Sequence, residues 1–398
     1  MTTHPLQPIA IKAQAVNFQA LPPLSLYIHI PWCVRKCPYC DFNSHEARDA
    51  FPEQEYVAAL IRDLELALPL IWGRKVYTVF FGGGTPSLLS GESIEQIIRS
   101  VRMLLPLDVN AEITLEANPG TVEAARFAAY RDAGVNRLSL GIQSFNDTHL
   151  HALGRIHTAA EAGRAIGIAQ QHFDNLNLDL MYALPGQTPE QALQDVRTAL
   201  QFAPQHLSCY HLTLEPNTLF HHSPPVLPDD DASGDMQQRI EELLAEHGYQ
   251  HYETSAFAQP KHRSRHNLNY WQFGDYLGIG AGAHSKLSFP DKVMRQARYK
   301  QPQAYMQQVA IDAPIQNEHE VSRDELAFEF MMNALRLNEG FDSVLFQERT
   351  SLPLLSIRRE LEEAERRGLL TRDHQRIAPT QLGQRFLNDL LEIFLAKS

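Results

Sequence analysis

The sequence predicts an α/β fold: a partial barrel of six β/α units, (β/α)6, followed by a small helical or winged-helix-like domain. Short apolar runs alternate with amphipathic stretches at intervals of about 30 residues, which is the spacing of βα units in a parallel sheet. From about residue 320, helical patterns follow one another without strands between them. The chain of 398 residues is 44% apolar, so it can bury a large core.

The six units are read from alternating strand and helix signals. The predicted strands are Leu24–Ile30, Val76–Phe81, Glu112–Glu116, Arg137–Ile142, Asn177–Met181 and Leu207–Leu212. The helices, with apolar residues three and four positions apart, are Glu53–Leu68, Ile94–Leu105, Val122–Ala133, Ala159–Gln171 and Glu190–Phe202. Six units are too few to close an eight-stranded barrel, so an open barrel is predicted. A doubly wound sheet is the alternative, but the first strand lacks a following Gly-x-Gly-x-x-Gly.

Three segments are predicted along the chain. Residues 1–22 show no sustained period and end near Pro22-Pro23, so we expect a loosely attached extension. Residues 23–300 form the barrel, and residues 301–398 form the C-terminal domain. The C-terminal helices are expected at Arg323–Leu337, Leu354–Arg367 and Gln381–Leu395.

Composition and charge exclude several classes of protein. The chain has 35 Lys and Arg against 47 Asp and Glu, a formal net charge of −12, which disfavours nucleic acid as a partner. There is no apolar run of about 18 residues and no secretory leader pattern. We therefore expect a cytoplasmic protein.

Three of the four cysteines lie close together in the motif CxxxCxxC, at Cys33, Cys37 and Cys40. A disulfide would leave one thiol over and is disfavoured in the cytoplasm. A redox dithiol at Cys37 and Cys40 would leave Cys33 without a role. Zinc would need a fourth ligand, for which His29 and His45 are the nearest candidates. An iron–sulfur cluster with three thiolates leaves one iron open to a ligand, and this interpretation is favoured.

The cysteine motif, with the preceding Tyr-Ile-His-Ile-Pro and the following Gly82–Pro86, resembles the radical S-adenosylmethionine (SAM) family, in particular its anaerobic coproporphyrinogen oxidase branch. The resemblance runs from about Leu24 to the C-terminus and implies a radical SAM barrel with a HemN-like C-terminal domain. It also implies a [4Fe–4S] cluster held by Cys33, Cys37 and Cys40, with SAM on the open iron.

Polar residues and glycines at the ends of the predicted strands fit the same interpretation. Active sites of such barrels gather where the strands end, so these side chains should meet around one ligand. Taken singly, each could be a capping or turn residue. The resemblance implies SAM contacts from Tyr27, Tyr39, Gly83, Gly84, Thr85, Glu116, Gln143, Arg155 and Asp179.

Two functions share this scaffold. The oxidase removes carboxyl groups from two propionates of coproporphyrinogen III and would make the chain an oxidoreductase of the coproporphyrinogen dehydrogenase type. A related branch consists of heme chaperones, which bind heme and transfer it to acceptor proteins. The oxidase pattern continues with a fourth cysteine, where this chain has Phe42. This departure favours the chaperone.

The second discriminating feature is His266-Asn267-Leu268-Asn269-Tyr270-Trp271, which matches the HNxxYW motif of the chaperone branch. Heme contacts are therefore expected at His266, Tyr270 and Trp271, with the imidazole as an axial iron ligand. The alternative is a packed, hydrogen-bonded histidine. Competing iron ligands are His211, His221, His222 and His284.

The resemblance further implies heme and heme-accepting proteins as partners, membrane-bound respiratory proteins among them, and it leaves a homodimer open. Whether SAM is cleaved, and hence whether the chain is an enzyme, does not follow from the sequence. The fourth cysteine, Cys209, lies in a predicted buried strand and is expected to pack as a small apolar residue.

Overall fold

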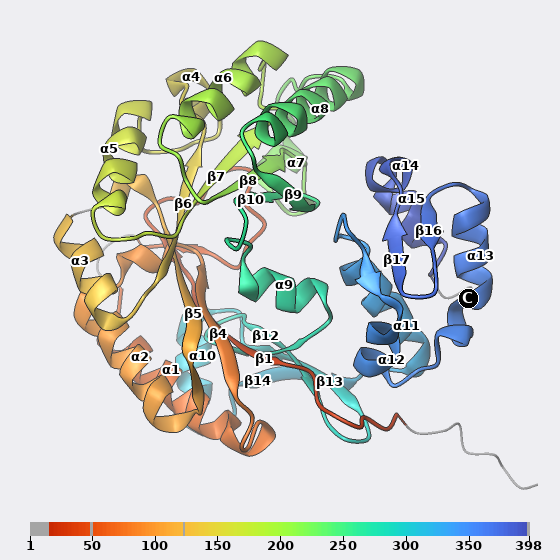
Figure 1. The fold of residues 1–398 in the computed structure, drawn as a ribbon. Helices are drawn as coiled ribbons and strands as arrows, with labels where there is room; N and C mark the ends of the chain where they lie inside the picture. The colour runs from red at the N-terminus through yellow and green to blue at the C-terminus, as the bar shows by residue number, and fades with distance from the viewer. Residues whose placement is uncertain (1–15, 48–50, 122–123, 396–398) are drawn as a thin grey trace, which may run out of the picture.

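The computed structural model describes residues 16–47, 51–121 and 124–395. One long, curved sheet dominates it (Figure 1). From edge to edge its strands are β14 (Ile315–Glu320), β13 (Val293–Arg298), β12 (His284–Ser288), β11 (Asp275–Ile279), β1 (Leu24–Ile30), β4 (Val76–Gly83), β5 (Leu107–Ala117), β6 (Arg137–Gln143), β7 (Leu176–Tyr182), β8 (His206–His211), β10 (Ala256–Ala258) and β9 (Gln250–Glu253). The two edges are different strands, β14 and β9, so the barrel is open, as predicted.

The middle of the sheet is parallel and contains all six predicted strands in chain order. Strand β1 pairs in parallel with β4, and the pairing continues through β5, β6 and β7 to β8. Six of the seven residues of β1 are buried, which is the pattern of a parallel strand covered on both faces. The sequence did not indicate β11, which pairs in parallel with the other side of β1. Antiparallel strands then extend both edges.

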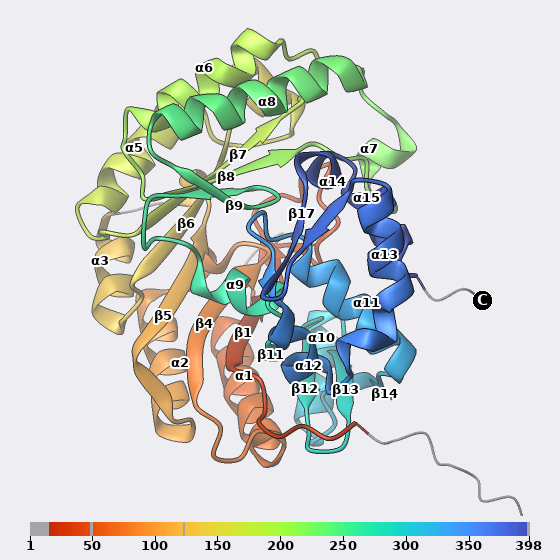
Figure 2. The ribbon, with the colours of Figure 1, turned by 45° about the vertical axis from the view of Figure 1, so that its right-hand side comes forward.

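Helices cover the convex face of the parallel strands (Figures 1 and 2). They are α1 (Glu53–Ala67), α2 (Gly91–Leu104), α3 (Ala124–Ala133), α5 (Ala159–Gln170), α6 (Pro189–Leu200) and α8 (Asp230–Glu246), with the short α4 (Asp147–Ala152) and α10 (Pro302–Val309) beside them. Capping boxes at Thr158 and Thr188 fix where α5 and α6 begin. Helix α2 begins before the predicted Ile94 because the Ser90 side chain accepts the backbone N–H of Ser93. Val122, the predicted start of α3, lies outside the described residues.

The C-terminal region forms a second, smaller layer with its own core. Its helices are α11 (Arg323–Ala334), α12 (Ser343–Thr350), α13 (Arg358–Arg366), α14 (Gln381–Arg385) and α15 (Leu387–Glu392), and its strands are β15 (Phe341–Asp342), β16 (Leu370–Arg372) and β17 (Arg376–Pro379). The β16–β17 hairpin between α13 and α14 gives the winged-helix-like arrangement. The predicted last helix is interrupted at Phe386, whose φ of −112° and ψ of 47° are not helical.

This region packs against the barrel rather than hanging from it (Figure 2). Phe330 of α11 contacts Phe273, two residues before β11, with ring centroids 5.8 Å apart. Strand β14 still belongs to the large sheet, so that sheet continues to Glu320. The boundary between residues 300 and 301 stays a prediction. Among the described residues, no helix is long and apolar enough to span a membrane.

Candidate functional site

The three clustered cysteines lie on one loop at the C-terminal end of β1. Cys33 belongs to β2 (Trp32–Cys33), which pairs in parallel with β3 (His45–Glu46) and so closes the base of the loop. Cys37 and Cys40 are joined by a tight turn, in which the Cys40 N–H donates to the Cys37 carbonyl at 3.1 Å. All three are free thiols and are partly exposed. Three thiols that can bind a metal are therefore concentrated on one short segment.

Lys36 holds this loop in shape from within. Its ammonium donates to the Phe42 carbonyl at 3.2 Å and to the Ser44 carbonyl at 3.4 Å, and its backbone N–H donates to the Glu46 carboxylate at 3.1 Å. These contacts join the middle of the loop to its end. Backbone and side-chain hydrogen bonds within the cysteine loop thus fix its shape.

The glycine segment after β4 packs directly beneath the cysteine loop. The Gly84 N–H donates to the Ile30 carbonyl and the Thr85 N–H to the Trp32 carbonyl, both at 2.7 Å. A Cβ at position 84 would lie 2.5 Å from the Trp32 oxygen, so only glycine allows this approach. The predicted Gly83, Gly84 and Thr85 therefore lie beside the thiols.

The donor set fits a cluster better than a single metal ion. Among the described residues, no three His, Cys, Asp or Glu side chains converge on one ion position. Thiolates that bind different irons of a cluster need not converge in this way. Of the proposed zinc ligands, His29 uses both ring nitrogens, on the Tyr27 hydroxyl at 3.0 Å and the Asn43 carbonyl at 2.9 Å. Burial raises the pKa of the Cys33 and Cys40 thiols, so metal binding would release their protons.

Two buried carboxyl groups lie near the glycine segment, Glu116 close to the end of β5 and Asp179 in the middle of β7. Glu116 accepts the Gly83 N–H at 3.3 Å. Burial and the nearby negative charge of Asp179 raise the pKa of Glu116 to about 8, so it is protonated at neutral pH and can donate a hydrogen bond. Asp179 accepts from Ser139 at 2.9 Å and from Asn177 at 2.8 Å. The predicted Glu116 and Asp179 thus interact.

Arg155 connects the end of β6 to the cysteine loop. Its guanidinium donates to the Gly141 carbonyl at 2.8 Å and to the Cys37 sulfur at 3.6 Å. Tyr39 lies beside Arg155, and burial raises its pKa. Gln143 has a φ of +68°, a left-handed conformation that is uncommon outside glycine. The predicted residues Tyr39, Gln143 and Arg155 therefore gather on the β6 side of the thiols.

The HNxxYW motif forms α9 (Arg265–Trp271), which lies inside the curve of the sheet (Figure 1). His266 is 1% exposed. Its Nδ1 bonds to the Thr78 hydroxyl at 2.7 Å and its Nε2 to the Tyr270 hydroxyl at 3.2 Å. The Glu112 carboxylate accepts the backbone N–H groups of Arg265 and His266 at 3.1 and 3.0 Å. Burial lowers the pKa of His266 to about 3, so the ring is neutral.

The two aromatic residues of the motif, Tyr270 and Trp271, lie in different surroundings. Tyr270 lines a pocket at the barrel mouth. Trp271 instead lies under the guanidinium of Arg336, in the turn that follows α11, 4.4 Å from the ring centroid. The structure thus brings Tyr270 to the barrel-mouth pocket and Trp271 to the C-terminal region. Iron ligation by His266 stays a prediction.

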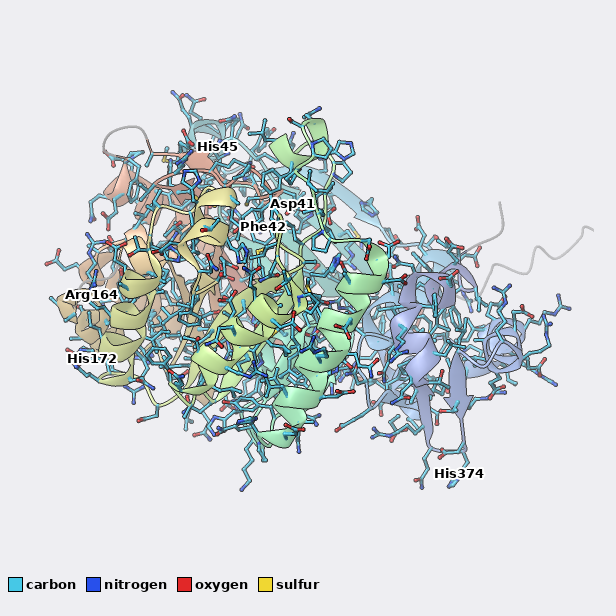
Figure 3. All side chains as sticks on the ribbon, turned by 90° about the horizontal axis from the view of Figure 1, so that it is seen from above. Asp41, Phe42, His45, Arg164, His172 and His374 are labelled. Atoms are coloured by element: carbon cyan, nitrogen blue, oxygen red, sulfur yellow. The ribbon has the colours of Figure 1, made fainter. Side chains whose placement is uncertain are left out.

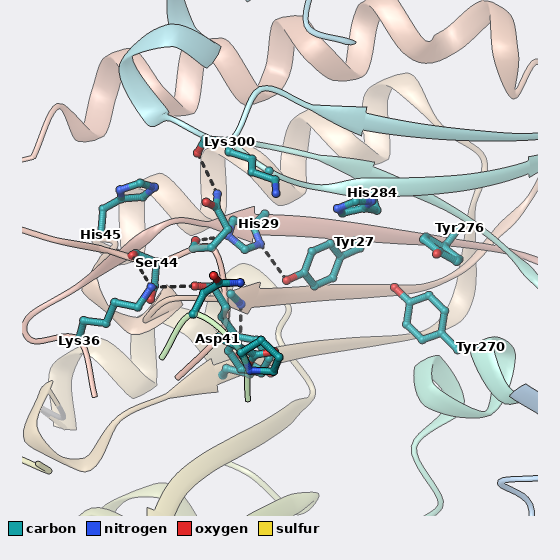
Figure 4. Close-up of a pocket in the computed structure, with 17 residues that line it drawn as sticks. Tyr27, His29, Lys36, Asp41, Ser44, His45, Tyr270, Tyr276, His284 and Lys300 are labelled. Atoms are coloured by element: carbon teal, nitrogen blue, oxygen red, sulfur yellow. Dashed lines mark hydrogen bonds between the residues drawn. The ribbon is translucent and has the colours of Figure 1, made fainter. Parts of the chain in front are cut away.

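The pocket at the barrel mouth has a volume of about 620 Å³, within the range of about 300–1,000 Å³ typical of cofactor sites. Figure 4 shows Tyr27, Tyr270, Tyr276 and His284 around the same space. Burial and nearby cationic side chains, Lys300 first among them, lower the pKa of His284. From above, the end of the cysteine loop at Asp41, Phe42 and His45 lies on the barrel, away from His374 in the C-terminal region (Figure 3).

Sequence reasoning missed part of this pocket. Tyr276, Lys300 and Lys36 line it but were not predicted as site residues, and His284 was considered only as a competing ligand. The available signal was the Gly278–His284 turn, whose Gly280 and Gly282 have φ of +102° and +80°. Such glycines permit close backbone packing, and Asn43 of the cysteine loop donates to the Ala281 carbonyl of this turn at 2.9 Å. The turn therefore carries β12 to the cysteine loop.

Comparisons with known proteins agree with this geometry. The model of the radical SAM superfamily matches residues 27–199, and that of the HemN C-terminal domain matches residues 321–386. The curated heme chaperone HemW of Escherichia coli (strain K12) is 51% identical over 379 residues, 95% of this chain and 99% of the relative. HemW of Bacillus subtilis (strain 168) is 33% identical over 94% of this chain and 99% of the relative.

The solved structure of coproporphyrinogen III oxidase (HemN) from Escherichia coli, a radical SAM enzyme, is similar at a TM-score of 0.80 and 25% identity, covering 94% of this chain and 91% of that one. The open parallel barrel, the three-cysteine loop and the C-terminal region thus define a radical SAM protein with a HemN C-terminal domain. At 51% identity over nearly the full length, the chain belongs to the same family as the HemW proteins.

Proposed function

We propose that this protein is a heme chaperone, which binds heme and passes it to acceptor proteins, on a radical SAM scaffold. The observation that carries the proposal is the near-full-length similarity to curated heme chaperones, at 51% and 47% identity for two of them. The HNxxYW sequence at His266–Trp271 and the Phe42 that replaces the oxidase cysteine support it. A pocket of about 620 Å³ lined by tyrosines offers the flat aromatic surface that a porphyrin needs.

Within this proposal, Cys33, Cys37 and Cys40 hold a [4Fe–4S] cluster. When bound, such a cluster with an open iron supplies an electron to SAM. Arg155, which already donates to Cys37 Sγ at 3.6 Å, would stabilise thiolate charge. The position of the three cysteines on one loop and their partial exposure support their assignment as cluster ligands.

The SAM contacts are assigned to the side chains and backbone around the thiols. Gly83, Gly84 and Thr85 offer closely approaching backbone, as the tight packing at Gly84 requires. The protonated carboxyl of Glu116 can donate to a ligand hydroxyl, and the Asp179 carboxylate next to it can accept. Tyr27, Tyr39, Gln143 and Arg155 complete the set. Burial of this set would exclude water from the reacting end of the ligand.

A second candidate is oxygen-independent coproporphyrinogen III oxidase, which the TM-score of 0.80 to HemN favours. One preparation distinguishes the two functions. After anaerobic reconstitution of the cluster, we expect hemin titration to give a stable Soret absorbance and heme to move to a heme-depleted respiratory membrane fraction. We expect coproporphyrinogen III to stay unconverted under reducing conditions with SAM. Conversion without retained heme would overturn the chaperone assignment and establish the oxidase.

Acceptor proteins, including membrane-bound respiratory proteins, complete the proposal as partners. Transfer by contact needs the heme edge to remain near the surface, and the pocket lies at an open barrel mouth. We place the exchange in the cytoplasm, where the free state of all four cysteines is expected. A homodimer would be tested by mass photometry of the reconstituted protein with and without hemin, with a doubled mass as the expected sign.

A further inference from the structure

Three histidines line the barrel-mouth pocket, and they differ in what their rings already contact. His29 bonds through both ring nitrogens, to Tyr27 and to Asn43. The Nε2 atom of His45 is completely covered by protein. His284, the first residue of β12, is exposed, and within the described part of the chain no hydrogen bond to its ring is found. His45 Nε2 has no hydrogen-bond partner either but is buried, so His284 alone of the three combines an exposed position with a ring that makes no hydrogen bond.

We propose that His284 is the axial ligand of the heme iron, with the porphyrin seated in the barrel-mouth pocket against Tyr270 and Tyr276. This inference rests on the proposed chaperone function and names the heme site. Imidazole is the commonest protein ligand of heme iron. Figure 4 shows the His284 ring facing the space between Tyr27 and Tyr276.

The surrounding residues suit the rest of a heme molecule. Tyr270 and Tyr276 pack edge to face, with ring centroids 4.5 Å apart, so their position is fixed before a ligand arrives. Lys300 lies in the same pocket and carries the charge that a propionate needs. Among the described residues, no partner binds its ammonium. Lys36, by contrast, is occupied by two carbonyls of the cysteine loop.

His266 then has a different role from the one its motif suggests. Its two ring nitrogens hold Thr78 and Tyr270, and Phe80 stacks on its ring with centroids 4.9 Å apart. Iron ligation there would break a hydrogen bond and uncover a ring that is 1% exposed. In this account His266 is a positioning residue, which fixes the Tyr270 hydroxyl at the wall of the heme pocket.

The test compares binding of hemin and of metal-free protoporphyrin IX to the full chain. His284→Ala is expected to weaken hemin binding about tenfold or more and to shift the Soret band, while protoporphyrin IX binds with unchanged affinity, because only the iron bond is lost. Added imidazole should restore the Soret band of this variant. Lys300→Ala should weaken both ligands, and the surface variant His374→Ala should weaken neither.

The outcomes separate this inference from the proposed function. If the unaltered protein binds no hemin, the chaperone function itself fails. If it binds hemin and His284→Ala keeps the wild-type Soret band and affinity, the assignment of His284 is wrong. Loss of the hemin spectrum in His266→Ala with rescue by imidazole would move the ligand to His266. Equal loss of hemin and protoporphyrin IX in His266→Ala supports its positioning role.

Discussion

Two sets of residues at the barrel mouth differ in how fully their polar atoms are used. The open set comprises Cys33, Cys37, Cys40 and His284, which are partly or fully exposed. The closed set is α9, where Glu112 accepts two backbone N–H groups and both nitrogens of His266 are hydrogen-bonded. A closed set holds the fold, whereas an open set is free to take a ligand. The HNxxYW motif can therefore hold the wall of the binding site in place without contacting the ligand through His266.

The largest expected effect falls on the open set. Cys37→Ala should abolish the broad visible absorbance of the reconstituted cluster, because a thiolate ligand is lost. The free energy of unfolding of the metal-free protein should change by less than about 1 kcal/mol, since this partly exposed thiol fills no core.

Cys209→Ala is the matched control, because Cys209 is buried in β8 and lies away from the loop. It should keep the cluster absorbance and lose stability instead. If the Cys37→Ala protein retained the full absorbance, Cys37 would not be a ligand of the cluster.

The next effect falls on the closed set. His266→Ala should lower the free energy of unfolding by about 3 kcal/mol, because it leaves a buried cavity and removes the hydrogen bonds from the ring to the hydroxyls of Thr78 and Tyr270. His284→Ala should cost less than about 1 kcal/mol, because its ring is exposed. Urea unfolding of the two variants side by side measures both. Equal losses of unfolding free energy in the two variants would contradict the distinction between the closed set and the open set.

A smaller effect concerns pH. Burial lowers the pKa of His266 to about 3 and of His29 to about 4, against an ordinary value of 6.5. Below pH 6.5 the unfolded chain binds protons that the folded chain does not, so stability is present above pH 6.5 and is lost as the pH falls toward about 4. Each group contributes up to about 1.4 kcal/mol per pH unit in that window.

Urea unfolding at pH 7 and pH 5 would measure this slope. His266→Ala should reduce the slope of the free energy of unfolding against pH by the contribution of one titrating group. An identical slope in the variant would show that His266 titrates in the folded protein as it does in the unfolded chain, which contradicts its place in the closed set.

The parallel strands could be predicted from the sequence because they are short, mostly apolar runs. All seven residues of the prediction Leu24–Ile30 form β1. Strand β11 was missed, since Asp275–Ile279 is short and contains a glycine. Strand β14 was missed because Ile315–Glu320 is almost entirely polar, as an exposed edge strand can be. Periodicity carries little information where a strand buries neither face.

The site was predictable where its residues are adjacent in sequence and not where the fold brings distant residues together. The cysteine motif and the Gly82–Thr85 segment each lie on one stretch of chain, and they meet as expected. The burial of His266 depends on Thr78 and Glu112, which are 188 and 154 residues away. The pocket wall from Tyr276 and His284 comes from β11 and β12, strands that the sequence did not indicate.

The most direct test of the account is the position of the heme iron in crystals of the heme-loaded protein, located by anomalous scattering at the iron edge. We predict a peak bonded to the His284 imidazole, within the pocket walled by Tyr270 and Tyr276 and separate from the peak of the cluster. A peak at His266, or one outside the barrel mouth, would contradict it.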